Sequence, residues 1–296
     1  MSTHIKTINT VAGRQARIVI SDGNWLEDAA IEQLKKTMTL SGMRCGVGMP
    51  DLHPGKGQPI GAAFVTQACI YPHLIGSDIG CGMGLWQLNI PTRKVKLDKW
   101  EKQLIQLDEN WHGDTTQYLA DRNVTTNDTF LLSEHHKLGT IGGGNHFSEL
   151  QQVDTIFDEF EFNHSGIDKK SVVLLVHSGS RGLGQKILRH HVDNFGAQAL
   201  STETKNMPFK QYLARHNYAE QWASANRQLI AQRFCDALKA SQTSILNINH
   251  NMVKPLTQQE IVAMKLEGST CNEEADYWIH RKGCLLYTSP SPRDRG

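Results

Sequence analysis

The sequence lacks three features that would each define a class of protein: long apolar runs, paired cysteines and an excess of one charge. Its longest plainly aliphatic run is residues 172–176, far short of the ~20 residues that span a bilayer, and residues 1–6 have no apolar signal-peptide segment. Lys and Arg number 31 against 30 Asp and Glu, which excludes a basic tail that binds polyanions without specificity. We therefore expect a soluble, cytoplasmic protein.

The six cysteines are scattered without a CxxC pair, so we expect no disulfides, and a working cysteine would be a metal ligand or a nucleophile. Hydrophobic residues at 39% and charged residues at 21% are ordinary for a compact globular chain of 296 residues. Fourteen histidines are present, several of them beside glycine or asparagine. These histidines are the first candidates for chemistry.

Helical and strand patterns mix without a regular βαβ order, which favours an α+β fold. Residues 16–20 are typical of a strand, residues 22–24 of a turn and residues 26–38 of an amphipathic helix. The glycine-rich region 46–84 is too apolar for a flexible linker, and we expect it to be an ordered, loop-rich site. Residues 100–107 repeat the amphipathic helical pattern.

Three further elements are predicted in the second half of the chain. Residues 171–177 form an apolar run followed by a Ser-Gly turn, which indicates a buried strand. Residues 217–240 contain neither Pro nor Gly and are rich in Ala, Gln, Leu and Arg, which predicts a long helix. Residues 245–250 alternate as a strand does, with His250 on the same face as Leu246 and Ile248.

Four short segments combine turn residues with side chains that can bind metal. Asp78 and Cys81 lie three residues apart among glycines, and His146 follows three glycines whose amides could hold an anion. His177 stands at a strand end and His250 between two asparagines. Each segment alone fits a structural turn with a core residue equally well. Together they offer the mixed O, S and N ligands that suit manganese(II), zinc or cobalt.

Two cationic side chains are candidates for binding phosphate. Arg181, in the turn after His177, carries a rigid fork of donors suited to phosphate oxygens. Lys56 lies in a turn-rich segment with Asp51, whose carboxylate could orient a histidine. A surface turn and a surface loop are the alternatives at these two places.

Taken together and in this order, these segments resemble the RtcB family of RNA ligases. The matching segments are residues 50–61, 78–83, 142–149, 177–184, 223–227 and 250–251. The resemblance extends over nearly all of residues 44–283 and implies a single RtcB-like domain of α+β class, with mixed sheets around a metal pocket and flanking helices. Residues 48–62 are most similar to the bacterial branch associated with a release-factor homologue, which implies such a protein as a functional partner.

The resemblance also implies the cofactors and the role of each residue. Cys81 would bridge two manganese(II) ions, with Asp78 and His146 on one and His177 and His250 on the other. The residues that would contact the nucleotide are Asn145, His146, Phe147, Ser148, Glu149, His250 and Asn251. The family reaction joins RNA 3′-phosphate or 2′,3′-cyclic phosphate ends to 5′-hydroxyl ends, in RNA repair or tRNA splicing. A histidine, which Asp51 would orient, first attacks the α-phosphate of GTP and becomes guanylylated as pyrophosphate leaves. The GMP then passes to the RNA 3′-phosphate, and the 5′-hydroxyl of another RNA end displaces it.

The sequence departs from this family pattern after Gly283. Residues 284–296 are rich in Pro, Ser and Arg and look like a non-native tail, so residues 1–283 are expected to form an incomplete ligase domain without the nucleophilic histidine. His280 belongs to a different family segment and is not a substitute. Two other functions stay open for such a chain: a dinuclear phosphoesterase acting on RNA ends, and a protein that binds RNA or metal without catalysis.

The departure generates a first prediction: the 296-residue chain should bind manganese but form no covalent guanylate, because positioned metals cannot replace the atom that accepts GMP. Ligation should be absent as well. The measurement is incubation with labelled GTP and manganese followed by denaturation, which removes bound nucleotide but leaves a phosphoramidate attached. Stoichiometric retained label would show that the nucleophile has been misplaced.

Overall fold

The structure is a computed structural model that describes residues 3–9, 14–21, 25–202, 206–264 and 276–284. Its contacts divide the chain into two compact units, each assembled from segments far apart in sequence. The first unit comprises residues 1–77, 186–214 and 250–296, and the second comprises residues 78–185 and 215–249. Both contain helices and sheets, which confirms the α+β class. The predicted domain bounds stay a prediction, and the expected turn at 22–24 lies outside the described residues.

The first unit contains a six-stranded sheet in the order β1-β2-β3-β4-β12-β11. Its strands are β1 (Thr3–Asn9), β2 (Gln15–Ser21), β3 (Met43–His53), β4 (Ile60–Gln67), β11 (Met252–Pro255) and β12 (Tyr277–Lys282). β2 pairs with β3 in parallel, whereas the other neighbouring strands are antiparallel. The smaller elements of this unit are β5 (Cys69–Ile70), α2 (Pro72–Ile75), β9 (Leu200–Ser201) and α9 (Gln258–Ala263).

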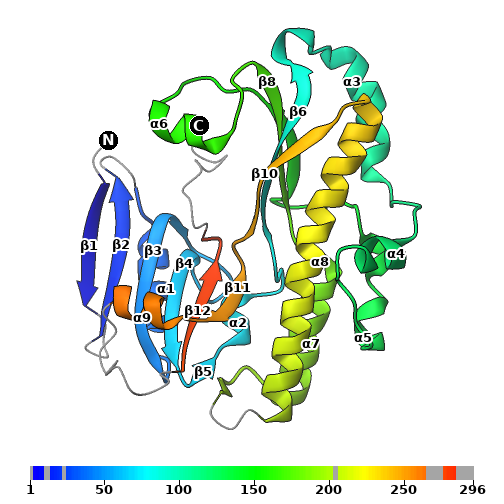
Figure 1. Ribbon diagram of the computed structural model, residues 1–296. Helices are drawn as coiled ribbons and strands as arrows, with labels where there is room; N and C mark the ends of the chain where they lie inside the picture. The colour runs from blue at the N-terminus through cyan, green and yellow to red at the C-terminus, as the bar shows by residue number, and fades with distance from the viewer. Residues whose placement is uncertain (1–2, 10–13, 22–24, 203–205, 265–275, 285–296) are drawn as a thin grey trace. The chain divides into compact units, whose positions relative to one another are not determined.

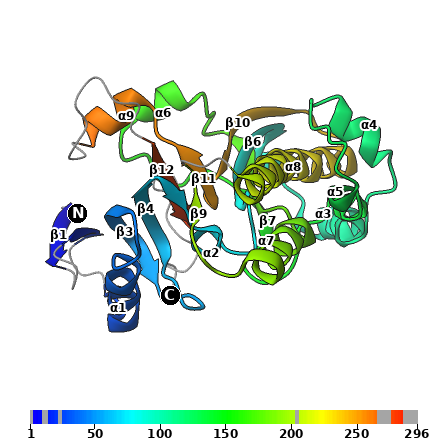
Figure 2. The same ribbon diagram turned by 90° about the horizontal axis from the view of Figure 1, so that it is seen from below.

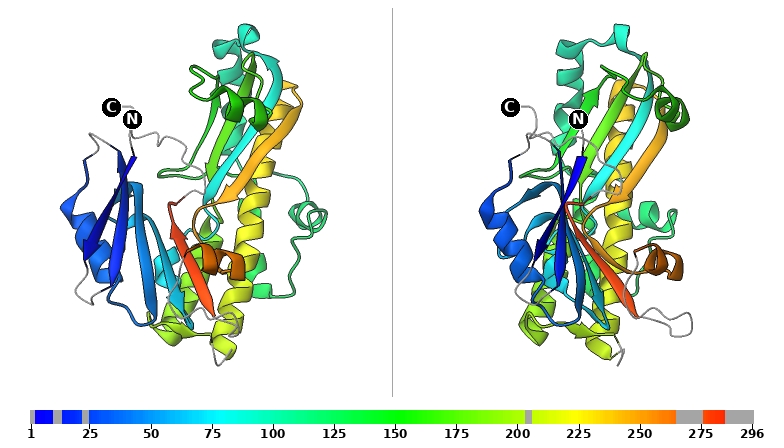
Figure 3. Two further views of the ribbon diagram at one scale, coloured as in Figure 1. Left: turned by 60° about the vertical axis from the view of Figure 1, so that its left-hand side comes forward. Right: turned by 90° about the vertical axis from the view of Figure 1, so that its left-hand side faces the viewer.

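Helix α1 (Asp28–Thr37) lies against this sheet (Figures 1 and 3). Leu34 and, just beyond the helix, Met38 are fully buried with Ile18 and Phe64 in one hydrophobic core. The strand predicted at residues 16–20 and the helix predicted at residues 26–38 are therefore confirmed as β2 and α1. Burial of one such aliphatic side chain stabilises the fold by about 1.5–3 kcal/mol.

The expectation of a loop-rich region between residues 46 and 84 is wrong, because β3, β4, β5, α2 and the start of β6 (Gly82–Pro91) together occupy most of it. The glycines belong to the strands for a packing reason. A Cβ on Gly46 would lie 2.6 Å from the Met38 Sδ atom and 3.1 Å from the Phe64 ring. Glycine at this position lets the residue that follows α1 pack directly on the strand backbone.

The second unit contains a four-stranded antiparallel sheet in the order β10-β6-β8-β7. Its strands are β6 (Gly82–Pro91), β7 (Phe147–Gln151), β8 (Ser171–Ser178) and β10 (Gln242–Asn249). The predicted buried strand at 171–177 is confirmed as β8. The predicted strand at 245–250 is β10, but it ends one residue before His250.

Several short helices complete the second unit. They are η1 (Thr92–Lys94), α3 (Leu97–Leu104), η2 (Ile105–Asp108), α4 (Thr115–Ala120), α5 (Thr129–Leu132), η3 (His135–Lys137) and α6 (Glu159–Ser165). The amphipathic helix predicted at 100–107 is confirmed as α3 and η2. No helix in the described part of the chain has both the length and the apolar character that crossing a membrane requires.

Helices α7 (Gly182–Phe195) and α8 (Met207–Leu238) continue from the residues of one unit into those of the other. α8 begins ten residues before the predicted start. The Asn206 side chain caps the helix by accepting a hydrogen bond from the Phe209 amide. Pro208 lies in the first turn, where a backbone N–H has no partner within the helix, so its missing N–H costs nothing. The helix ends where Lys239 adopts a left-handed conformation. In the second unit α8 runs beside β6 and β10 (Figures 1 and 2), and its Ile230 and Phe234 pack in one core with Trp86 of β6.

The buried His216 of α8 generates a pH prediction for stability. Burial lowers its pKa from 6.5 to about 4, and the hydrogen bond with the Asn217 side chain offsets this effect only in part. As the pH falls from about 6.5 to 4, the imidazole of His216 becomes protonated in the unfolded chain but not in the folded chain. Its contribution to the free energy of unfolding is therefore fully present above pH 6.5 and is lost as the pH falls. The loss is of the order of 3 kcal/mol at pH 4.

The measurement is urea unfolding of the metal-free protein at pH 7.5 and at pH 4.5. His216→Gln should reduce the difference in unfolding free energy between the two pH values. The matched control is His136→Gln, at an exposed histidine of the same unit, which should follow the wild type. An unchanged difference in the His216 variant would contradict the assignment.

Candidate metal centre

The antiparallel order of the second unit's sheet brings four segments to one end of it. Gly82, the first residue of β6, pairs with Ser178 near the end of β8 and with Asn249 at the end of β10. Phe147, the first residue of β7, pairs with His177. Because neighbouring strands run in opposite directions, two strand starts and two strand ends coincide there. Each of the four expected Cys and His ligands is within one residue of these paired ends.

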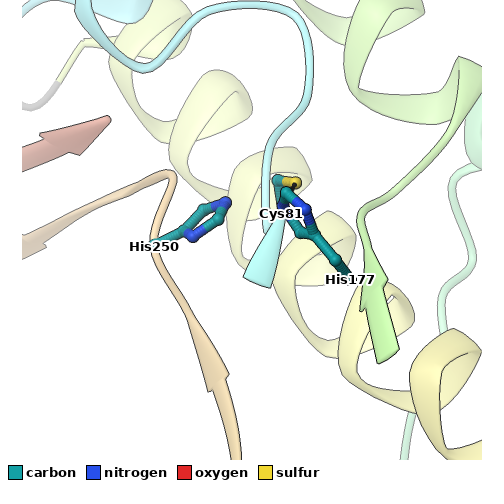
Figure 4. A group of neighbouring side chains, drawn as sticks. All are labelled: Cys81, His177 and His250. Carbon is teal, nitrogen blue, oxygen red and sulfur yellow. Dashed lines mark hydrogen bonds between the residues drawn. The ribbon is translucent and has the colours of Figure 1, made fainter. Parts of the chain in front are cut away.

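The side chains of these segments converge. The Cys81 Sγ atom lies 3.2 Å from the His177 Nε2 atom and 3.4 Å from the His146 Nε2 atom. The His146 Nε2 atom lies 2.7 Å from the Asp78 Oδ2 atom. His250 directly follows Asn249 and is carried to the same end by β10. Figure 4 shows Cys81, His177 and His250 as neighbours.

The possible ligand atoms form two groups that share one residue. The atoms of Asp78, Cys81 and His146 all lie within 4.8 Å of one another, as do those of Cys81, His177 and His250. Two ligands held about 2.0–2.3 Å from one ion are about 3.1–3.6 Å apart at ordinary coordination angles. The distances from the sulfur to the two imidazoles fall in this range, so the donor set and its spacing fit a transition-metal ion.

The turn that presents Cys81 depends on glycine. Gly80 has a φ of +72°, and a Cβ on it would lie 2.8 Å from the Ala223 Cβ atom and 2.9 Å from the Glu220 Cα atom of α8. Any side chain here would therefore be strained and would push the turn away from the helix. The glycines around Cys81 were expected to permit a tight turn, and the close approach to α8 gives the structural reason.

Burial determines the protonation of the cluster. Cys81 is 2% exposed, and its removal from water raises the pKa of the thiol well above the ordinary value, an effect that the Asp78 carboxylate reinforces and Arg227 partly offsets. Burial, together with the neighbouring His146, lowers the pKa of His177 to about 4. At neutral pH the imidazole of His177 is therefore uncharged and can act as a ligand, whereas metal binding must remove the thiol proton.

Two residues that organise this end of the sheet had no role assigned from the sequence: Asn226 and Arg227 of α8, both 0% exposed. The Arg227 guanidinium donates to the carbonyl oxygens of Gly80 and Ser178 over 2.8 and 2.9 Å. The Asn226 side-chain amide donates to the Ser178 hydroxyl over 3.1 Å. The sequence gives one indication of this position. Arg227 lies four residues after Ala223 and therefore on the same helix face, and the structure shows that Ala223 is buried.

Arg181 was expected to meet phosphate, and the structure places it beside the cluster. Its Nη1 atom lies 3.0 Å from the His146 Nδ1 atom, and its backbone is left-handed with a φ of +58°. Among the expected nucleotide-binding residues, Asn145 and Glu149 are exposed, whereas Phe147 and Ser148 are half-buried. The ring of Phe147 packs on His177 with centroids 5.4 Å apart. The ligand roles of these residues stay predictions.

The remaining expected site residues belong to the first unit. Asp51 and Lys56 are exposed, at β3 and in the turn after it, and the His53 ring nitrogen contacts the Asp51 carbonyl oxygen over 2.7 Å. The Asn251 side chain accepts a hydrogen bond from the Gly283 amide. His280 is fully buried, and its Nε2 atom accepts a hydrogen bond from the Tyr71 amide. This arrangement supports the view that His280 is no nucleophile, because the lone pair on Nε2 is already used.

The fold and the site define an α+β protein with a buried cysteine–histidine–aspartate cluster of the kind that holds transition metals. The family model described as "tRNA-splicing ligase RtcB" matches residues 33–113 and 114–291. The chain therefore belongs to the RtcB family, which confirms the resemblance seen in its motifs.

Relatives in all three domains of life share this similarity. "RNA-splicing ligase RtcB2" of Escherichia coli is 41% identical over 94% of this chain. "RNA-splicing ligase RtcB homolog 1" of Entamoeba histolytica is 24% identical over 88% of the chain, and "tRNA-splicing ligase RtcB" of Thermococcus kodakarensis is 27% identical over 87%. The chain spans 66%, 60% and 65% of the lengths of these proteins, so it covers less than two thirds of each.

The shared position of Cys81 generates a prediction about metal stoichiometry. If the thiolate bridges two ions, Cys81→Ala should reduce the binding of both, because this residue belongs to both ligand groups, whereas His146→Ala should reduce the binding of only one. Elemental analysis after equilibrium dialysis against manganese(II) measures both. The control is Cys235→Ala, which removes another buried thiol of the same unit from a core position in α8. Loss of a single ion from the Cys81 variant would exclude a bridging thiolate.

Proposed function

We propose that this chain supplies the metal-binding part of an RNA ligase that joins RNA 3′-phosphate or 2′,3′-cyclic phosphate ends to 5′-hydroxyl ends, in RNA repair or tRNA splicing. GTP is the co-substrate and two manganese(II) ions are the cofactors. The observation that carries the proposal is the convergence of Asp78, Cys81, His146, His177 and His250 at one end of a sheet, in a chain that belongs to the RtcB family.

The chemistry of the donor set supports the choice of cofactor. Bound divalent ions neutralise charge on phosphoryl oxygens and hold a leaving group in line. The thiolate and the imidazoles suit borderline ions such as cobalt(II) and zinc, and the carboxylate suits the harder manganese(II). Among these ions, we choose manganese(II) because of the family resemblance. Free thiols such as that of Cys81 stay reduced in the cytoplasm, which is where we place the reaction.

The chain's own residues would bind and orient the reacting groups. The Asp78 carboxylate contacts the Nε2 atom of His146 over 2.7 Å. The Arg181 guanidinium contacts the Nδ1 atom, so both ring nitrogens are restrained. The exposed Asn145 follows directly on the triple-glycine loop and the exposed Glu149 lies in β7, where both side chains are available to a nucleotide. The exposed Lys56 is a candidate for binding the phosphates of the RNA backbone.

The identity of the partner follows from the same resemblance. Residues 48–62 are similar to the bacterial branch that is associated with a release-factor homologue, and we propose such a homologue as a functional partner. The names of the relatives, which refer to RNA and tRNA splicing, support RNA as the substrate class.

The test uses a hybrid in which the sequence of the 41% identical relative continues after Gly283 of this chain. With GTP and manganese(II), the hybrid should convert RNA with 3′-phosphate and 5′-hydroxyl ends to ligated product. Cys81→Ala in the hybrid should lower the rate by more than the roughly 10- to 100-fold that loss of an outer-shell partner costs at metal sites, and Cys235→Ala should not.

Two other outcomes would contradict the ligase proposal. If the hybrid opens a 2′,3′-cyclic phosphate with manganese alone and ligates nothing, the site is that of a phosphoesterase. If it binds RNA without any chemistry under either manganese or cobalt, the protein is a binding module. Gel separation of labelled RNA distinguishes these products in one experiment.

A further inference from the structure

The guanidinium of Arg227 is a fully buried cation whose hydrogen bonds go to neutral oxygens. Besides the carbonyls of Gly80 and Ser178, it contacts two side-chain amides: Nε donates to the Asn247 Oδ1 atom over 2.7 Å and Nη2 to the Asn249 Oδ1 atom over 2.6 Å. Burying a charge in this way is costly unless its donors are satisfied. Four hydrogen bonds use four of the five donors that arginine has.

The position of these acceptors is what distinguishes Arg227 from an ordinary buried arginine. Gly80 immediately precedes Cys81, Ser178 immediately follows His177, and Asn249 immediately precedes His250. One planar group therefore fixes the chain next to three of the five candidate ligands. A lysine has a single charged nitrogen and cannot span these three segments with one rigid plane.

The acceptors are themselves held in place. The Asn247 amide donates to the Ser224 carbonyl oxygen of α8 over 3.0 Å, and the Asn249 amide donates to the Glu220 Oε1 atom over 3.2 Å. Both strand residues are thus linked to α8 twice, once through Arg227 and once directly. Each of these two acceptors is thus hydrogen-bonded through both its oxygen and its nitrogen, which restrains its position.

We propose that Arg227 is a positioning residue of the metal centre: through two backbone carbonyls and the Asn249 side chain, its guanidinium holds three chain segments so that their ligands have the binding geometry before a metal arrives. This inference rests on the proposed metal site but not on GTP or RNA chemistry. A preformed site binds more tightly because ordering its ligands has already been accomplished on folding.

The experiment compares Arg227→Lys with Arg215→Lys in the full chain, with cobalt(II) as the probe. Arg215 is a matched control, since it is another buried arginine of α8, bonded to Asp128 over 2.7 Å and stacked on the Phe130 ring. The thiolate-to-cobalt absorption band reports the Cys81 bond, and its titration gives the dissociation constant. Arg227→Lys should weaken binding about 10- to 100-fold, while Arg215→Lys should match the wild type.

A purely structural arginine would act on folding instead. Thermal unfolding of the metal-free proteins separates the two roles, because such a residue would lower the melting temperature and leave the cobalt affinity of the folded protein unchanged. Wild-type affinity in folded Arg227→Lys would overturn the proposal. If the wild type itself shows no thiolate band, the proposed metal site fails instead, so the two failures are distinguishable.

A second variant covers the case in which Arg227→Lys does not fold. Asn249→Ala keeps the buried cation and its two carbonyl bonds but removes one acceptor of the fork, at a position that is only half-buried. It should weaken cobalt binding and shift the thiolate band. Unchanged affinity and an unchanged spectrum in this folded variant would also overturn the positioning role.

Discussion

The antiparallel pairing of β6 with both β8 and β10 is the constraint on which the site depends. Strand direction determines which chain ends meet, and a slip of one residue would turn every side chain of a strand to the opposite face. The register that pairs Gly82 with Ser178 and Asn249 puts Cys81 between the segments that carry His177 and His250. The chemistry of the cluster is therefore set by backbone hydrogen bonds as much as by its side chains.

Helix α8 serves this unit in two different ways along its length. Toward its C-terminal end, Ile230 and Phe234 form an apolar core with the sheet, which supplies stability through burial. One to two turns earlier, Asn226 and Arg227 replace apolar packing with a network of hydrogen bonds. Such a network contributes little to the net free energy of unfolding but permits few alternative arrangements. It lies beside the candidate metal ligands, whose geometry it restricts.

The spacing of apolar residues along the chain was sufficient to predict the elements that bury one continuous face. The strand at β8 and the helix at α1 follow from the period of their apolar residues alone. Glycine misled the prediction between residues 46 and 84, because Gly46 is required by contact with Met38 and not by a loop. The early start of α8 was missed because Pro208 was not recognised as a first-turn residue.

The candidate ligands could be named from the sequence because each stands beside turn residues, but their meeting could not be derived from local patterns. It depends on the order of four strands, which is a property of the whole unit. The buried position of Arg227 was even harder to predict from the sequence. An arginine among alanines resembles a solvent-exposed helix position, and only its spacing from Ala223 indicates the buried face.

The separation of the ligands along the chain has a consequence for biosynthesis. Cys81 and His177 are 96 residues apart, and a ribosome adds about 5–20 residues per second, so the thiol emerges on the order of 5 to 20 seconds before its imidazole partner. During that interval β6 has neither β8 nor β10 to pair with. The nascent cysteine is open to oxidants and to any thiol-seeking ion, and the final centre can be assembled only after translation has passed β10.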